Sequence, residues 1–313
     1  MSLNSKNTVY HYTSPSGLLG IVNNEEDHEN AKLWFTRCDS LNDRSERNNI
    51  KEALKAYKKD KKSKGKTIPK EFQDAIEELI NTEVNEWKLS PIPWHYYDDT
   101  YNLKCMNLSD PDPDNIYICS FSIDEDSLPM WNYYSKSSHY EGYALEIDVA
   151  KWEEYVKELV GCALDIRRVI YHEKDKIKKI DEIISECKHP QEDVKKYLLK
   201  TMGTEYIEQI FALRIAELQF YFKDEHFSHE NEVRAILKIP KDKDFSNKII
   251  TKYRAGNGYI IPYVEVPVPK EAITSVTVGP LLEKELAKKN VKEMLESRGC
   301  SCDVHTSEIP IRF

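Results

Sequence analysis

Three groups of polar side chains stand at the ends of predicted strands, where a rigid scaffold can hold catalytic groups. They are His11, Ser120 with Ser122, and Glu230 with Glu232. A histidine between two tyrosines on a strand can point a neutral imidazole into a cleft while its neighbours face the other side. Serines two residues apart share one strand face, and carboxylates at the same spacing can divide into one acid and one base. We therefore take these five as the candidate site residues.

Each of these groups also has an ordinary structural explanation. A histidine on a core strand is often buried and satisfied by a backbone carbonyl. Serine pairs on strands are common, and no nucleophile-elbow pattern surrounds Ser120 and Ser122. Glu232 is followed by Arg234 on the same predicted face, so the glutamates can equally form a salt-bridged strand entrance. The sequence leaves both explanations open.

Aromatic and loop residues offer further ligand contacts. Trp131, Tyr133 and Tyr134 lie in a short predicted helix and can stack on a planar ring, although tryptophan-rich helices usually pack in a core. Asn42 and Asp43 follow the second predicted strand and offer hydrogen bonds to hydroxyls, but Asn-Asp is also a common turn pair.

Two sets of residues raise the question of a metal site. Residues 300–302 are Cys-Ser-Cys and His305 follows, yet structural zinc sites use longer spacers and a second ligand pair. His226, His229 and Glu230 match neither His-Glu-x-x-His nor its inverse. We therefore expect no metal, with a metal-dependent hydrolase that uses His226, His229 and Glu230 as one alternative.

The elements that would hold these residues alternate between strands and helical inserts. Short apolar runs rich in β-branched residues predict strands at residues 9–12, 33–36, 116–121, 143–148, 166–171, 232–237, 259–266 and 273–278. Helical periodicity predicts helices within residues 49–87 and 173–222 and a last helix over residues 282–298. Strands without strict βαβ alternation indicate an α+β fold. We expect one elaborated domain over residues 1–313, with a lysine-rich helical insertion at 49–95 and a second insertion at 173–222.

The composition suits a globular chain with a substantial core. The 313 residues are 40% hydrophobic and 32% charged, and the net charge of −9 excludes a polyanion binder held by overall charge. Nine lysines against two acids from Lys51 to Lys70 form a local basic segment that could contact phosphates, although charge runs are usually solvated faces. No apolar run approaches the roughly 20 residues of a membrane span, and no signal peptide is recognisable. We expect a cytoplasmic protein with reduced cysteines and no membrane contact.

Six motifs, in this order along the chain, together resemble the bacterial domain-of-unknown-function family 2971. The motifs are YHYT at 10–13, LWFT at 33–36 leading to LND at 41–43, CSFS at 119–122, MWNYY at 130–134, GYAL at 142–145 and ENEVR at 230–234. The resemblance covers nearly the whole chain outside the lysine-rich insertion. It identifies relatives but implies no activity.

A more distant resemblance, to the ADP-ribosyltransferases, implies an activity. That superfamily carries a His or Arg on its first strand, a Ser-x-Ser strand and a late Glu, and His11, Ser120 with Ser122, and Glu232 follow this order. The resemblance implies a split mixed or antiparallel sheet that cleaves NAD and moves ADP-ribose to a macromolecule. Glu232 would bind the 2′-hydroxyl of the nicotinamide ribose and stabilise an oxocarbenium-like transition state, and Glu230 would activate the acceptor.

The same resemblance implies contacts to the rest of NAD. His11 would hold ribose hydroxyls and Tyr134 would stack on nicotinamide. The other residues expected around NAD are Thr13, Asn42, Asp43, Ser120, Ser122, Trp131 and Arg234. The alternative from another class is a non-catalytic module that holds nucleic acid or a partner protein through the same cleft or through the segment from Lys51 to Lys70.

Overall fold

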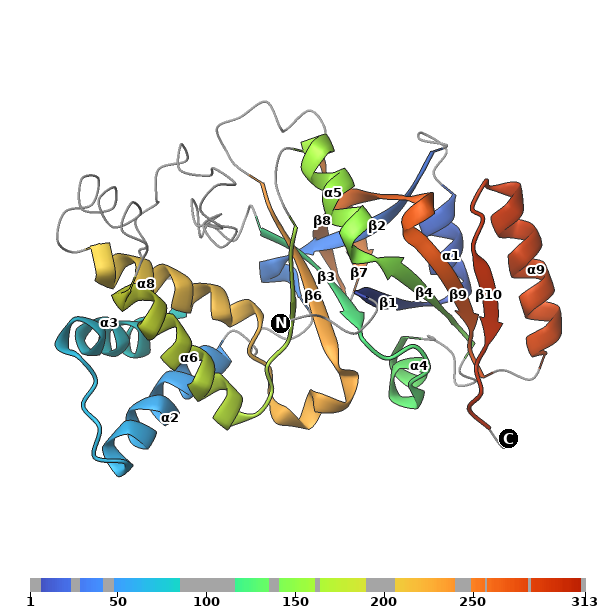
Figure 1. The fold of residues 1–313 in the computed structure, drawn as a ribbon. Helices are drawn as coiled ribbons and strands as arrows, with labels where there is room; N and C mark the ends of the chain where they lie inside the picture. The colour runs from blue at the N-terminus through green and yellow to red at the C-terminus, as the bar shows by residue number, and fades with distance from the viewer. Residues whose placement is uncertain are drawn as a thin grey trace. The chain divides into compact units, whose positions relative to one another are not determined.

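The chain forms two compact units in a computed structural model (Figure 1). The structure describes residues 7–23, 29–41, 48–84, 116–134, 141–160, 164–189, 206–239, 249–256, 258–280 and 283–310. The first unit comprises Met1–Leu41, Pro113–Arg168 and His229–Phe313, and the second comprises Asn42–Asp112 and Val169–Ser228. Each unit has a hydrophobic core of its own.

A mixed, open sheet builds the first unit. Its strands are β1 (Thr8–Thr13), β2 (Asn30–Arg37), β3 (Ile116–Ser122), β4 (Tyr143–Asp148), β5 (Asp165–Arg168), β6 (Glu232–Lys238), β7 (Thr251–Gly256), β8 (Tyr259–Pro269), β9 (Ile273–Val278) and β10 (Asp303–Thr306). Among these strands β10 runs parallel to β9, and the other pairings are antiparallel. The sheet and its covering helices confirm the predicted α+β class.

The sheet branches at β3. Strand β6 pairs with all seven residues of β3, so β1 and β2 must share the other edge. Ser122, at one end of β3, pairs with Tyr10 of β1, while residues 117 and 118 pair with β2. The path continues through β4, β9 and β10 on the β1 side and through β8 and β7 on the β2 side. This branching brings the ends of β1, β3 and β6 together.

Helices pack on the sheet and supply part of its core. They are α1 (Pro15–Val22), α4 (Leu128–Tyr134), α5 (Val149–Val160) and α9 (Lys284–Ser297), with the short 3-10 turns η1 (Cys38–Ser40) and η11 (Lys270–Ala272). A further 3-10 turn, η9 (Glu225–Glu230), precedes β6 in the chain. Helix α1 begins with residues that favour a helix N-terminus, because the Ser14 side chain accepts a hydrogen bond from Gly17 N and Pro15 occupies the first turn. Trp152 of α5 packs edge-on against Phe35 and Phe121, with ring centroids 5.9 and 5.6 Å apart.

Among its described residues, the second unit contains four α-helices. They are α2 (Asn49–Ser63), α3 (Lys70–Asn81), α6 (Glu173–Lys188) and α8 (Tyr206–Glu217), followed by η8 (Leu218–Phe220). Phe72 of α3 meets Phe211 of α8 edge-on with ring centroids 5.0 Å apart. The two predicted insertions, distant in sequence, therefore share one core. No helix in the described parts of the chain is both long and apolar enough to cross a membrane.

Two predicted elements differ from the structure. The strand predicted at residues 166–171 ends at Arg168 in β5, and Ile170 then makes an isolated bridge with Phe222. The segment that holds Glu230 and Glu232 is not continuously extended, because Glu230 ends η9 before Glu232 begins β6.

Candidate functional site

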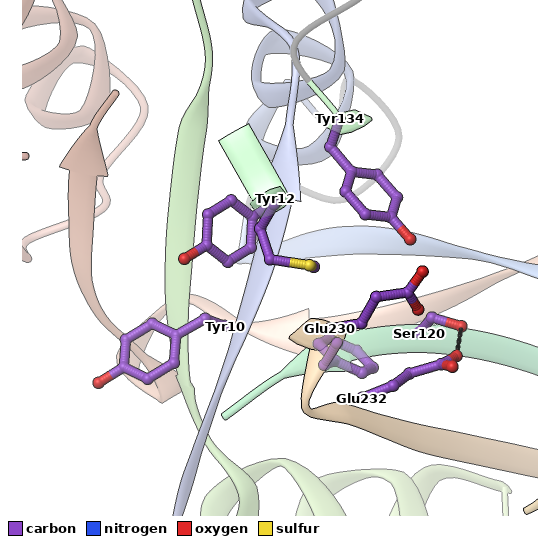
Figure 2. Close-up of a pocket in the computed structure, with 8 residues that line it drawn as sticks. Tyr10, Tyr12, Ser120, Tyr134, Glu230 and Glu232 are labelled. Carbon is purple, nitrogen blue, oxygen red and sulfur yellow. Dashed lines mark hydrogen bonds between the residues drawn. The ribbon is translucent and has the colours of Figure 1, made fainter. Parts of the chain in front are cut away.

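A small, open pocket lies beside the ends of β1, β3 and β6 and the helix α4 (Figure 2). The residues that line it are Tyr10, Tyr12, Ser120, Phe121, Met130, Tyr134, Glu230 and Glu232. The space enclosed within it is only about 10 Å³, which is room for about one water molecule. A ligand ring would therefore have to lie over the open side of the pocket or displace the side chains that line it.

Strand register gathers the polar residues of β3 and β6 on one face. Ser120 pairs with Arg234 and Ser122 with Glu232, and residues directly opposite each other in an antiparallel pair share a face. The intervening Phe121 belongs to the main core on the other face. The alternation expected from sequence thus puts both serines on the same face of the sheet as Glu232 and Arg234.

Glu232 is held in a fixed orientation by two neighbours. Its Oε1 accepts hydrogen bonds from Ser120 Oγ at 2.6 Å and from Arg234 Nε at 2.8 Å, and its Oε2 accepts from Arg234 Nη2 at 3.1 Å. Glu232 is only 5% exposed and Arg234 4%. The two-point guanidinium contact favours the ionised carboxylate and fixes its plane. The salt-bridged strand entrance proposed from sequence is present, and the same carboxylate lines the pocket.

Glu230 reaches the pocket by a different route from the one expected. The expectation that it shares an extended strand face with Glu232 is wrong, because Asn231 has a φ of 43° and turns the chain between them. Ser122 Oγ donates to the Glu230 carbonyl at 2.8 Å and accepts from Asp124 N at 3.1 Å, which secures this turn. The pocket still gains a second carboxylate, and Figure 2 shows Glu230 beside Ser120 and Glu232.

His11 does not point into this pocket. It pairs with Leu145, whose side chain is in the main core, so its ring projects from the opposite face of β1 to Tyr10 and Tyr12. The ring lies edge-on to Phe121 with centroids 5.4 Å apart, and Nδ1 is 3.3 Å from the Ser120 carbonyl oxygen. Burial lowers the pKa of His11 to about 4, and the hydrogen bond with Ser120 offsets this in part. The imidazole is therefore neutral near pH 7 and donates Nδ1–H to the carbonyl.

Of the aromatic candidates, Tyr134 is the one in the pocket lining. Trp131 is only 1% exposed and packs edge-on against Tyr12, with ring centroids 4.7 Å apart. Its Nε1 donates a hydrogen bond to Asp126 Oδ1 at 2.7 Å, so Trp131 belongs to the core. Tyr133 Oη lies 3.2 Å from His229 Nε2. Tyr134 is 40% exposed, and Figure 2 shows its hydroxyl directed toward Glu230.

Tyrosines 10 and 12 were missed as pocket residues. Tyr10 donates to Glu146 Oε1 at 2.9 Å, and Tyr12 donates to the Asp124 carbonyl at 2.8 Å and accepts from Ser127 N at 3.0 Å. Burial raises the pKa of both phenols, so they remain neutral. Strand alternation predicts that Tyr10 and Tyr12 point to the face opposite His11. Because the pocket lies on that face, the alternation is the sequence signal that identifies both tyrosines as lining residues.

Thr13, another NAD candidate, is not part of the pocket lining. Thr13 ends β1, is partly buried and pairs with Tyr143. Asn42 and Asp43 lie outside the described residues.

The basic segment carries less unpaired charge than its sequence implies. Among its nine lysines, at least five form ion pairs with carboxylates. The pairs are Lys51–Glu83, Lys55–Glu52, Lys58–Glu77, Lys61–Asp181 and Lys64–Asp60. Contact of this segment with a polyanion stays a prediction.

The described residues hold no cluster of metal ligands. Within the residues that the structure describes, no three His, Cys, Asp or Glu side chains converge on one point. Cys300 and Cys302 do approach each other, with sulfurs 3.9 Å apart, while His305 is exposed on β10.

Comparison with protein families supplies one match. Residues 130–235 match the family described as a protein of unknown function (DUF2971), which confirms the predicted family resemblance over this segment. The segment contains three of the six motifs, at 130–134, 142–145 and 230–234. The matched segment begins in α4 and includes Glu230, Glu232 and Arg234. No curated protein and no solved structure matches the chain.

Proposed function

We propose that this chain, which matches the DUF2971 family, is an NAD-cleaving ADP-ribosyltransferase that works through the pocket around Glu232. The observation that carries the proposal is a buried carboxylate, oriented by Ser120 and Arg234, beside the second carboxylate of Glu230. Paired carboxylates at a sugar carbon are the groups that cleavage of a glycosidic bond requires.

The reaction would proceed at the anomeric carbon of the nicotinamide ribose. The bond from this carbon to the nicotinamide nitrogen breaks, its electron pair leaves with nicotinamide, and positive charge develops on the ribose. The Glu232 carboxylate accepts the 2′-hydroxyl hydrogen bond and stabilises that charge. A nucleophile of the acceptor protein or nucleic acid then bonds to the anomeric carbon, and Glu230 removes its proton.

The residues of the pocket suit one end of NAD. Carboxylates accept hydrogen bonds from ribose hydroxyls, and the exposed ring of Tyr134 offers a face for nicotinamide. The enclosed space of about 10 Å³ is smaller than a sugar, so the ribose would lie over the open side of the pocket and the ADP portion would extend beyond it. His11 acts here by positioning, since its ring bonds the carbonyl of Ser120, whose hydroxyl holds Glu232.

Turnover of NAD labelled in the ADP-ribose portion tests the proposal. The full chain is incubated with candidate protein and nucleic-acid acceptors, and released nicotinamide and labelled acceptor are measured separately. We expect Glu232→Gln to lower nicotinamide release by about 10²–10³-fold, the usual cost of removing one transition-state contact. Glu230→Gln should reduce transfer to the acceptor more than it reduces release, because it acts on the nucleophile.

Glu265→Gln is the matched control. Glu265 is also ion-paired, to Lys32 at 3.3 Å and Lys252 at 2.8 Å, but it does not line the pocket. Turnover should survive in this variant, and a melting curve of each variant checks that it is folded. Equal nicotinamide release by wild type and Glu232→Gln, or no release with any acceptor, would sink the assignment.

A further inference from the structure

Two cysteines lie side by side at the end of α9. Their sulfurs, Cys300 Sγ and Cys302 Sγ, are 3.9 Å apart, and both residues are free thiols. Cys300 is 1% exposed and belongs to the main core, whereas Cys302 is partly buried against that core. Neither residue lines the pocket around Glu232. The pair therefore combines one anchored sulfur with one that solvent can reach.

The backbone on both sides keeps the two sulfurs close. Gly299 adopts a φ of 69° after the helix, and Cys300 N donates to Leu295 O at 2.9 Å, which closes the helix end. Immediately after Cys302, Asp303 begins β10 in register with Ser275 of β9. The three-residue segment is thus held at both ends, which keeps the two cysteines close to each other.

We propose that Cys300 and Cys302 form a reversible intramolecular disulfide, a redox-sensitive modification site separate from the pocket. A disulfide needs sulfurs about 2.05 Å apart, so the present separation must shorten by roughly 2 Å. Rotation of the partly exposed Cys302 side chain supplies this movement while Cys300 stays packed in the core.

The co-reactant is a small-molecule disulfide, and the exchange proceeds in two steps. The Cys302 thiolate attacks one sulfur of the small disulfide, which forms a mixed disulfide and releases one small thiolate. Cys300 then attacks the Cys302 sulfur and expels the second small thiolate. The protein gives up two protons and two electrons, and the small disulfide is reduced to two thiols.

The electrostatic surroundings favour the second step, in which Cys300 is the attacking thiolate. The contact with the Cys302 sulfur and the nearby Lys270 ammonium lower the pKa of the Cys300 thiol, although burial opposes them. The same contact, together with burial, raises the pKa of Cys302, so its attack in the first step depends on its exposure and not on a lowered pKa. Lys270 Nζ is fixed at 2.6 Å from the Arg298 carbonyl, close to the end of α9.

Equilibration of the full chain with glutathione and its disulfide tests the proposal. After acid quenching, free thiols are alkylated in denaturant and the peptide that holds residues 300–302 is analysed by mass. We expect this peptide to lose two hydrogen atoms and to resist alkylation. At fixed glutathione disulfide, about tenfold more glutathione should lower the ratio of oxidised to reduced peptide about 100-fold, because two thiols are released; a mixed disulfide would change only about tenfold.

Variants separate this disulfide from adventitious oxidation. Cys302→Ser and Cys300→Ser should each abolish the internal disulfide, and in Cys300→Ser the remaining Cys302 should carry one glutathione. Cys187→Ser is the control, since burial raises the pKa of Cys187 to about 11, and it should leave the 300–302 disulfide unchanged. A wild-type peptide that stays fully alkylatable, or that carries glutathione with the tenfold dependence, would overturn the proposal.

Discussion

Acidification should destabilise the sheet unit through His11. Burial sets the pKa of His11 at about 4 in the folded chain, against 6.5 for an exposed histidine. Between these values the unfolded chain binds the proton more tightly, so the contribution to stability is complete above 6.5 and is lost as the pH falls through this window. The free energy of unfolding falls by about 1.4 kcal/mol per pH unit within this window, which amounts to about 3 kcal/mol by pH 4.

A His11→Asn variant isolates this contribution. An Asn side chain keeps an N–H donor that can reach the Ser120 carbonyl but does not titrate, and all other groups cancel in the difference between the two proteins. Urea unfolding is followed by the fluorescence of the buried Trp131 and Trp152, both in the sheet unit. The stability of wild type relative to the variant should fall by about 3 kcal/mol between about pH 7 and pH 4.

Two results would refute the reasoning about His11. One is a difference between wild type and His11→Asn that does not change with pH. The other is an NMR titration in which the His11 ring protonates near 6.5. Either result would mean that the imidazole is solvated in the folded chain, as a ligand-binding His11 in an open cleft would be.

Two further predictions concern buried carboxylates. Arg234→Met should lower the free energy of unfolding by about 3–5 kcal/mol, because it leaves Glu232 charged and buried. Adding Glu232→Leu should recover most of that loss. If the effects of the two substitutions on urea unfolding were additive, the pairing would be contradicted.

For Glu146, burial acts to raise the pKa, but four hydroxyl donors from β1 and β9 outweigh it and lower the pKa below 4.5. The ionised Glu146 carboxylate therefore stabilises the fold above pH 4.5, and this contribution is lost as the pH falls below 4.5. The difference in free energy of unfolding between wild type and Glu146→Gln should narrow as the pH falls through that range. A difference that does not change with pH would contradict this prediction.

Much of the local structure could be predicted from sequence because its causes are local. Ser14 and Pro15 mark the start of α1 by the chemistry of a helix N-terminus. Strand alternation puts Ser120 and Ser122 on one face of β3, as observed. Apolar runs identified most strands of the sheet.

Local pattern misled where the backbone departs from a regular element. Glu230 and Glu232 have the spacing of one strand face, but the left-handed Asn231 turns the chain between them. Trp131 is a residue type that can stack on a ligand ring, yet its indole packs against Tyr12 and donates a hydrogen bond to Asp126. No sequence pattern reports a single residue's φ or the partner that a side chain will find.

The sequence by itself determined the α+β class, the family resemblance and the residue types available for chemistry, because period, caps and motifs depend on near neighbours. Only the tertiary structure decided which of those residues meet. Ser120 and Glu232 are 112 residues apart and come within 2.6 Å, because β6 pairs along the full length of β3. His11 is 109 residues from Ser120 and reaches only its backbone carbonyl, because the branch at β3 puts the ring on the core face. Long-range strand pairing chooses the face of each side chain, and that choice selects the members of the site.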